Sequence, residues 1–298
     1  MNITATPEVA TFDTDFGVKF GHFICFDILF NKPTLEILKQ NVSHLLYPSM
    51  WFSEVPFLTS LETQQGFAYR NNIVLLSAGT NNPGQGNTGS GIFVGKHGAI
   101  DMLITPKEMT KLIVAQVPKD VNDIPAPSTN SIIRYSPVEL DAFKVLSFTP
   151  SYSRGLPNMI YDDDNLVKIC KGKICCEFTV TYRKLVIPKG KKGFHYRLTV
   201  FSGLRNYANI LKAGDLYCAI ITCTDETNQS CGKRFTKSDQ LVPSIEFQEI
   251  KIKATVEIED DEHNYQLMPM NLDFNMLPLN TTAFNFTWQD VRKDEKTG

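Results

Sequence analysis

Short apolar runs and segments of helical spacing alternate along the first hundred residues. Apolar positions within 16–25 predict two short strands, the second ending near Cys25. Pro33, ahead of Leu35 and Leu38, predicts a helix, because proline is favoured in the first helical turn. A buried strand, a helix and another strand are then expected at 44–47, 57–70 and 73–78. Alternating strands and helices indicate an α/β layer.

Beyond Gly91 the pattern is mainly that of strands. A hairpin is predicted by 91–94 and 99–104, and a further strand by 111–117. Three prolines within 118–131 indicate a linker. Later β-like runs predict a β-rich second domain, at 177–182, 196–201 and 217–223. The acidic run at 258–263 is interpreted as a solvated loop. We therefore expect one domain at 1–117, a linker at 118–140 and a second domain at 141–298.

Composition narrows the class of protein. The 298 residues are 42% hydrophobic and 21% charged, which permits a substantial core and excludes wholesale disorder. A net charge of −2 argues against nucleic acid or a basic membrane-binding surface. No run reaches the roughly 18 apolar residues of a membrane helix, and the polar C-terminus lacks a lipid-anchor signal.

Seven cysteines fall into a cluster of six and one outlier, Cys25. The cluster lacks the C-x2-C or paired-histidine spacing of zinc sites, so we expect no metal. Three disulfides among 15 possible connectivities are expected instead. Adjacent cysteines on a strand point to opposite faces, so Cys175 and Cys176 are expected to have different partners. The six are Cys170, Cys175, Cys176, Cys218, Cys223 and Cys231.

An oxidising compartment is also indicated by five N-x-S/T glycosylation sequons, at Asn2, Asn41, Asn228, Asn280 and Asn285. The N-terminus has neither the charged nor the apolar region of a signal peptide. A disulfide-bonded protein needs a route to its compartment. We therefore expect the chain to lack its natural beginning.

Two candidate binding motifs are excluded by their sequence context. Residues 84–89 (GQGNTG) match the dinucleotide-binding fingerprint, but a strand-like segment rather than a helix follows, so a loop is expected. The five histidines are scattered without metal-binding spacing. No cofactor is expected.

Cys25 is the strongest candidate for chemistry. A lone cysteine on a strand is more often a small buried hydrophobe. This one lies where a strand gives way to a turn before a helix, which presents the thiol and the next N–H, that of Phe26, to a pocket. The Phe26 N–H is therefore a candidate oxyanion donor.

The segment 21–30 (GHFICFDILF) closely resembles the nucleophile segment of the vanin and biotinidase branch of the nitrilase superfamily. The likeness continues through 47–51 (YPSMW), 88–92 (TGSGI) and the spacing of the six clustered cysteines. It implies the C-terminal half of an αββα sandwich, followed by a β-rich, disulfide-bonded base domain. The proteins of this branch are secreted or cell-surface glycoproteins.

The resemblance also implies hydrolysis of a small linear amide. Vanins cleave pantetheine and biotinidase releases biotin from biocytin, through a Glu–Lys–Cys triad and a thioester. Cys25 matches the nucleophile, so a pantetheine-like substrate is expected. Asp27 is interpreted as fixing the turn. Trp51 matches an aromatic residue at the pocket edge, where it contacts substrate or packs.

The sequence departs from the family in one respect. The family's Glu and Lys lie upstream of the nucleophile, but the 24 residues before Cys25 hold no matching motif around their acids and lysine, namely Glu8, Asp13, Asp15 and Lys19. No spacing argument makes Glu54 or Glu62, further along, the base. We interpret the chain as part of a vanin-like amidohydrolase with little activity alone. A secreted, non-catalytic binding glycoprotein is the alternative.

Overall fold

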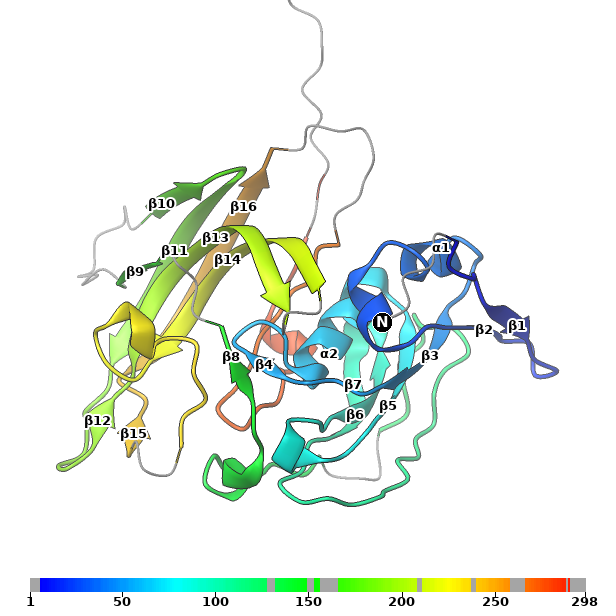
Figure 1. Cartoon of the computed structure of the whole chain (residues 1–298), viewed down its shortest axis with the longest axis horizontal. Coiled ribbons are helices and arrows are strands. Elements are labelled where there is room, and N and C mark those ends of the chain that lie inside the picture. The colour runs from blue at the N-terminus through cyan, green and yellow to red at the C-terminus, as the bar shows by residue number, and fades with distance from the viewer. Residues whose placement is uncertain are drawn as a thin grey trace, which may run out of the picture.

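A computed structural model describes residues 6–127, 132–148, 153–155, 166–207, 211–236, 240–257, 266–287 and 289. Figure 1 shows an N-terminal domain, built on a mixed sheet with helices, beside a C-terminal domain of strands. This arrangement confirms the predicted class, mixed α/β followed by a β-rich, disulfide-bonded part. The domain boundaries expected from the sequence stay a prediction.

Six strands form the sheet of the N-terminal domain, in the order β1-β2-β3-β5-β6-β7. They are β1 (Thr11–Asp13), β2 (Lys19–His22), β3 (His44–Ser49), β5 (Val74–Gly79), β6 (Ser90–Val94) and β7 (Gly98–Leu103). β2, β3 and β5 run parallel, while β1, β6 and β7 pair antiparallel with their neighbours. The central strands β3 and β5 carry near-continuous apolar runs, as strands covered on both faces do. The predicted hairpin at 91–104 is confirmed.

Both α-helices of the described chain pack on one face of this sheet. α1 (Thr34–Leu38) contacts β2, and α2 (Ser60–Asn71) crosses β5, β6 and β7. Leu45, Phe67 and Phe93 lie in the core between these helices and the sheet. Asn72 ends α2 in the left-handed conformation, with a φ of +49°. The two helices predicted from the sequence are therefore confirmed, although α2 begins three residues later than expected.

The strand expected to end near Cys25 is wrong in its bounds. β2 ends at His22, and Cys25 begins a short 3-10 turn, η1 (Cys25–Leu29). The expectation that Cys25 lies where a strand gives way to a turn is confirmed.

The strand expected at 111–117 is wrong. This segment joins no ladder, and its Ala115 and Val117 pack with Val74 and Val94. Val74 and Val94 point away from the helices, because successive residues of a strand alternate between faces. The apolar spacing of 111–117 therefore reflects contact with the outer face of the sheet rather than pairing within it.

The glycine-rich segment 84–89 is a loop, as predicted. It overlaps the end of the 3-10 turn η2 (Pro83–Gln85) and leads directly into strand β6 rather than into a helix. The turn η3 (Gly95–His97) joins β6 to β7, and η4 (Glu139–Ala142) follows the linker region.

The C-terminal domain packs two three-stranded sheets, ordered β10-β11-β16 and β14-β13-β9. Their strands are β9 (Ser153–Gly155), β10 (Leu166–Lys171), β11 (Ile174–Lys184), β13 (His195–Tyr207), β14 (Leu211–Cys223) and β16 (Ile245–Val256). Phe178, Val180, Leu198 and Val200 form the core between the sheets. The three β-like runs predicted for this region are confirmed. The acidic run at 258–263 lies outside the described residues.

Two further connections tie the domains together. The first is the parallel pair of β4 (Glu54–Val55) and β8 (Leu146–Ser147), whereas the pair of β12 (Lys192–Gly193) and β15 (Leu241–Val242) lies inside the C-terminal domain. Residues 266–287 return to the N-terminal domain, where Leu277 joins its core and the Gln65 amide donates to the Leu279 carbonyl at 2.7 Å. This stretch contains η7 (Thr281–Ala283). Among the described residues, no helix is long and apolar enough to span a membrane.

Candidate active site around Cys25

Cys25 occupies a strained position at the start of η1. Its φ is +53°, a left-handed conformation that few residues other than glycine adopt. The Asp27 carboxylate accepts a hydrogen bond from the Ile24 N–H at 2.9 Å and so closes the turn. This contact matches the interpretation that Asp27 fixes the turn. A sharp turn after a strand exposes a nucleophile at its tip, as in the strand-to-helix elbows of α/β-hydrolases.

The contacts of Cys25 tie it to strand β3 and the loop after it. The half-buried thiol donates to the Met50 carbonyl at 3.5 Å, and the Cys25 carbonyl accepts from the Tyr47 hydroxyl at 2.8 Å. Burial, together with the nearby Cys25 thiol, raises the pKa of Tyr47 well above its usual range, so Tyr47 stays a neutral donor. Among the residues that the structure describes, Cys25 is the one free cysteine.

Phe26 brings both a backbone donor and an aromatic ring to the site. The first hydrogen bond of η1 runs from the Asp27 N–H to the Ile24 carbonyl, so the N–H of Phe26 has no intrahelical partner. This leaves it available as the donor that the sequence predicts. The Phe26 ring stacks on Trp51, with centroids 5.2 Å apart, and meets Tyr207 edge-on at 6.1 Å.

Trp51 lies against Phe26, as a residue of the pocket wall would. Its side chain is only 4% exposed, and its indole N–H donates to the Leu58 carbonyl at 2.9 Å. Of the two roles considered from the sequence, packing accounts for these contacts. Direct contact with a substrate stays a prediction. The structure thus brings Cys25, Phe26 and Trp51 together.

The hydrogen bonds of Cys25 go to Met50 and Tyr47 and to none of the acids or the lysine upstream of it. Glu8, Asp13 and Asp15 are exposed, and the Lys19 ammonium donates to the Gln40 carbonyl at 3.0 Å. The position of Lys19 early in β2 therefore does not make it an oxyanion partner.

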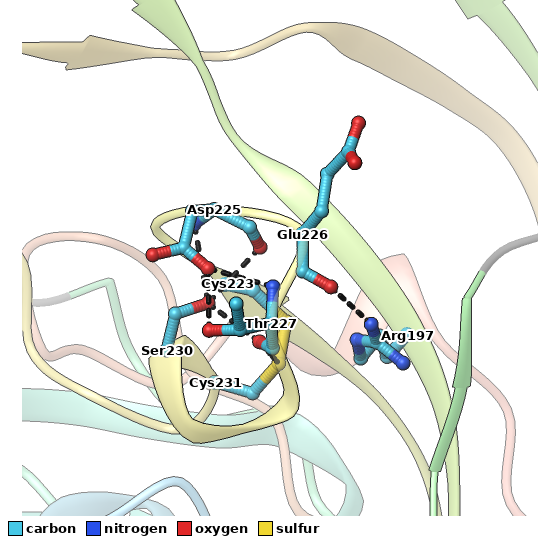
Figure 2. The surroundings of a disulfide bond; sticks show 7 residues. All are labelled: Arg197, Cys223, Asp225, Glu226, Thr227, Ser230 and Cys231. Carbon is cyan, nitrogen blue, oxygen red and sulfur yellow. Dashed lines mark hydrogen bonds between the residues drawn. A yellow bond between two sulfur atoms is a disulfide. The ribbon is translucent and has the colours of Figure 1, made fainter.

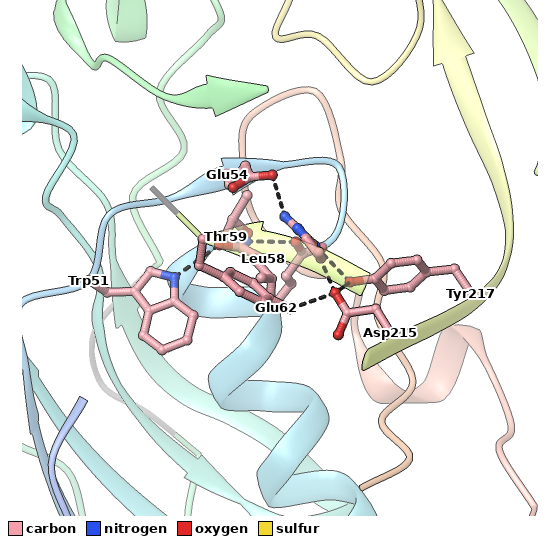
Figure 3. Close-up of polar contacts among 9 residues, drawn as sticks. Trp51, Glu54, Leu58, Thr59, Glu62, Asp215 and Tyr217 are labelled. Carbon is pink, nitrogen blue, oxygen red and sulfur yellow. Dashed lines mark hydrogen bonds and ion pairs between the residues drawn. The ribbon is translucent and has the colours of Figure 1, made fainter. Parts of the chain in front are cut away.

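The two downstream acids belong to a buried polar cluster between the domains. We call this the interdomain polar cluster; it comprises Glu54, Glu62, Arg205, Tyr207, Asp215 and Tyr217 (Figure 3). Arg205 is 2% exposed and forms ion pairs with Glu54 and, at 3.6 Å, with Asp215. Burial opposes its charge, but Tyr217 and Glu54 raise its pKa above the ordinary value. No sequence signal pointed to this cluster, because its two parts, 54–62 and 205–217, lie about 150 residues apart.

Glu62 is held at the start of α2, where it caps its own helix. Its carboxylate accepts from the Thr59 N–H at 2.8 Å, while the second oxygen, Oε2, is buried without a partner among the described residues. Burial raises the pKa of Glu62 to about 8, so the carboxyl is largely protonated at neutral pH. A neutral carboxyl is a poor base, and this argues against Glu62 as a catalytic base for Cys25.

The six clustered cysteines form three disulfides, as predicted. The pairs are Cys170–Cys175, Cys176–Cys218 and Cys223–Cys231. Cys175 and Cys176 have different partners, as their opposite orientations on β11 require. Figure 2 shows Cys223–Cys231 closing a turn in which the Asp225 carboxylate accepts from the Thr227 N–H at 2.6 Å. Three disulfides fit an oxidising compartment.

Four of the five sequons fall on described residues. Asn41, Asn280 and Asn285 are exposed and Asn228 is half-buried, while Asn2 lies outside the described residues. Their glycosylation stays a prediction. Within the described chain, no three His, Cys, Asp or Glu side chains gather as metal ligands would.

A cleft of about 550 Å³ opens elsewhere between the domains. Phe52, Lys144, Leu146 and Arg234 are among the residues that line it, and none of Cys25, Phe26 and Trp51 does. The candidate site is therefore separate from this cleft.

Comparisons with known proteins show what this chain is similar to. Residues 156–298 match the model of the Vanin C-terminal domain. Vanin-like protein 1 of Drosophila melanogaster is 34% identical over 98% of this chain and 54% of its own length, and Vanin-like protein 2 is 32% identical over 99% and 57%. Mus musculus biotinidase is 29% identical over 80% of this chain and 49% of its own length. The chain spans about half the length of the curated relatives it matches.

Proposed function

Because this chain belongs to the vanin and biotinidase branch of the nitrilase superfamily, we propose that it is the nucleophile-bearing part of an extracellular amidohydrolase acting on a small, pantetheine-like linear amide. One observation carries the proposal. The free thiol of Cys25 lies at the tip of a strained turn, next to the Phe26 N–H, which has no intrahelical partner.

In the proposed reaction, Cys25 Sγ attacks the amide carbonyl carbon. The oxyanion that forms accepts a hydrogen bond from the Phe26 N–H. The C–N bond then breaks, the amine leaves with a proton and an acyl thioester remains on Cys25. Water hydrolyses the thioester, which releases the carboxylic acid and restores the thiol.

The remaining catalytic groups are not supplied by the described contacts of Cys25. The family pattern calls for a Glu as base and a Lys at the oxyanion, whereas Lys19 bonds to Gln40 and Glu54 pairs with Arg205. We therefore expect the amide substrate to acylate Cys25 in a chain of these 298 residues, with slow turnover. Removal of a general base or an oxyanion donor typically costs about 10²–10⁴ in rate.

The test compares this chain with a version extended upstream to include a Glu and a Lys of the family pattern. Both are incubated with a pantetheine analogue that carries a chromogenic amine, and intact mass reports the acyl group. We expect slow acylation of the short chain, none in Cys25→Ala, and turnover at least about 100-fold faster in the long version. Equal turnover by both versions would contradict the missing-group interpretation. No acylation in either would contradict the nucleophile assignment.

The contacts of Cys25 are also compatible with one alternative, a non-catalytic binding glycoprotein. In that case the thiol of Cys25 has a packing role. Iodoacetamide separates the two proposals, since a reactive Cys25 supports a retained site and an inert thiol supports packing.

A further inference from the structure

The aromatic ring next to the nucleophile is held from two domains. Trp51 of the N-terminal domain stacks on the Phe26 ring, with an interplanar angle of 20°. Tyr207, from β13 of the C-terminal domain, meets the same ring at 78°. Both arrangements are favourable for aromatic pairs. The orientation of Phe26 therefore depends on a residue about 180 positions away in the sequence.

Tyr207 is itself fixed by hydrogen bonding. Its hydroxyl donates to the Asp215 carboxylate at 2.5 Å, which also accepts from the Tyr217 hydroxyl at 2.6 Å. The guanidinium of Arg205 lies over the Tyr207 ring, 4.8 Å from its centroid. A buried side chain with these contacts has little rotamer freedom, so it forms a rigid support for Phe26.

The second ring that contacts Phe26, that of Trp51, is anchored to the same cluster. Its indole donates to the Leu58 carbonyl, and Leu58 and Glu54 exchange backbone hydrogen bonds at 2.9 and 3.0 Å. Glu54 in turn pairs with Arg205. Figure 3 shows Trp51, Leu58 and Glu54 on one side of the cluster, with Asp215 and Tyr217 on the other. Arg205 thus contacts Tyr207 directly and is linked to Trp51 through Glu54 and Leu58.

From these contacts we infer that Tyr207 of the C-terminal domain is a positioning residue for the nucleophile turn, holding Phe26 so that its N–H points to the developing oxyanion. This inference rests on the proposed function of Cys25 and Phe26. It assigns the C-terminal domain a direct part in the active site, because the turn lacks its edge-on support without β13.

Two reactions of Cys25 separate positioning from exposure. With 4-nitrophenyl acetate, an Sγ–C bond forms, the ester C–O bond breaks, 4-nitrophenolate leaves and the thiol proton passes to solvent. This step passes through an oxyanion that the Phe26 N–H stabilises. Alkylation by iodoacetamide displaces iodide and forms no oxyanion. The ratio of the two rate constants therefore reports the position of the N–H, while access to the thiol affects both.

The test uses the full chain and three variants. Tyr207→Leu removes the ring, Tyr207→Phe keeps the ring without the hydroxyl, and Tyr196→Leu removes a ring from the same strand. Tyr196 packs on Phe247 and lies 11 residues from Tyr207, roughly 35 Å along an extended strand. We expect Tyr207→Leu to lower the ratio of acylation to alkylation about tenfold, and the other two variants to change it less than about threefold.

Each outcome bears on a stated claim. Equal ratios for Tyr207→Leu and Tyr196→Leu, with wild-type acylation intact, would overturn the positioning role and leave the proposed function standing. If Cys25 of the wild-type chain takes up no acetyl group while iodoacetamide alkylates it, the proposed function fails, and the positioning role fails with it. A thermal unfolding scan of each variant confirms that the comparison is made on folded protein.

Discussion

The guanidinium of Arg205, on β13, pairs with the carboxylate of Glu54, on β4 of the other domain. The arginine side chain is 1% exposed and that of Glu54 is 14% exposed, so water screens this pair weakly. Asp215 balances the arginine from a second side. Charges buried in this way depend on one another, because each has given up its hydration.

Replacement of Arg205 by methionine is therefore expected to destabilise the protein. Arg205→Met leaves Glu54 and Asp215 without their cation, and the loss of one partner of a buried pair costs about 3–5 kcal/mol. Urea unfolding measures the change. In the matched control, Arg183→Met, the lost pair with Glu246 is exposed, and a change below about 1 kcal/mol is expected. Equal effects of both substitutions would show that the interdomain pair is energetically unimportant.

The disulfides are expected to differ in their contributions to stability. Cys176–Cys218 closes a loop of 42 residues between the two sheets, whereas Cys170–Cys175 closes one of five. In the loop-entropy model the longer loop contributes about 4 kcal/mol and the shorter about 2 kcal/mol. Paired Cys→Ala replacement of each bond, followed by denaturant unfolding, tests this order. A larger loss from the 170/175 pair would indicate that loop entropy does not govern these bonds.

The turn at Cys25 and the order of an α/β part before a β-rich part were predictable because they depend on local signals. Apolar runs and Pro33 each report on a few neighbouring residues. The strand expected at 111–117 shows where such signals end. Period-two spacing is the same for a strand in a ladder and for a segment lying across a sheet, and only the hydrogen bonds, which depend on distant strands, distinguish them.

The interdomain polar cluster was unpredictable for a related reason. Arg205 lies within a strand of otherwise ordinary pattern, and nothing near it in the sequence identifies Glu54 as its partner. Likewise, no periodicity shows that Leu277 returns to the core of the N-terminal domain. Residues that position Cys25 from a distance are therefore found only in the folded chain.

The free energy of unfolding is expected to depend on pH because Glu62 is buried, and its burial sets the sign of that dependence. Burial raises its pKa from 4.5 to about 8, so between these values the folded chain binds more protons than the unfolded chain. The stabilising contribution of the protonated carboxyl is complete below pH 4.5 and is lost as the pH rises toward 8. The free energy of unfolding should fall by up to about 1.4 kcal/mol per pH unit through this window.

Glu62→Gln removes the titration and should flatten this slope, as measured by urea unfolding at pH 5, 6, 7 and 8. The matched control is Glu36→Gln, on the exposed side of α1, which leaves the slope between pH 5 and 8 in place, because Lys39 lowers the pKa of Glu36. An unchanged slope in Glu62→Gln would mean that another group titrates in this window.

Asp27 is expected to matter more for acylation of Cys25 than for stability. Asp27→Ala removes the acceptor of the Ile24 N–H, a change that costs about 1 kcal/mol at other helix caps. The larger consequence is geometric, because the same contact holds Cys25 at its φ of +53° and aims the Phe26 N–H. We expect the ratio of acylation to alkylation to fall about tenfold. Asp225→Ala is the matched control, since that carboxylate also accepts a backbone N–H, that of Thr227, but beside the 3-10 turn η5 (Asn228–Ser230) of the C-terminal domain. Its loss should lower stability by a similar amount and leave the ratio unchanged. If both variants lower the ratio by the same factor, the fall is caused by general destabilisation. The turn at Cys25 then does not need Asp27 to hold its geometry.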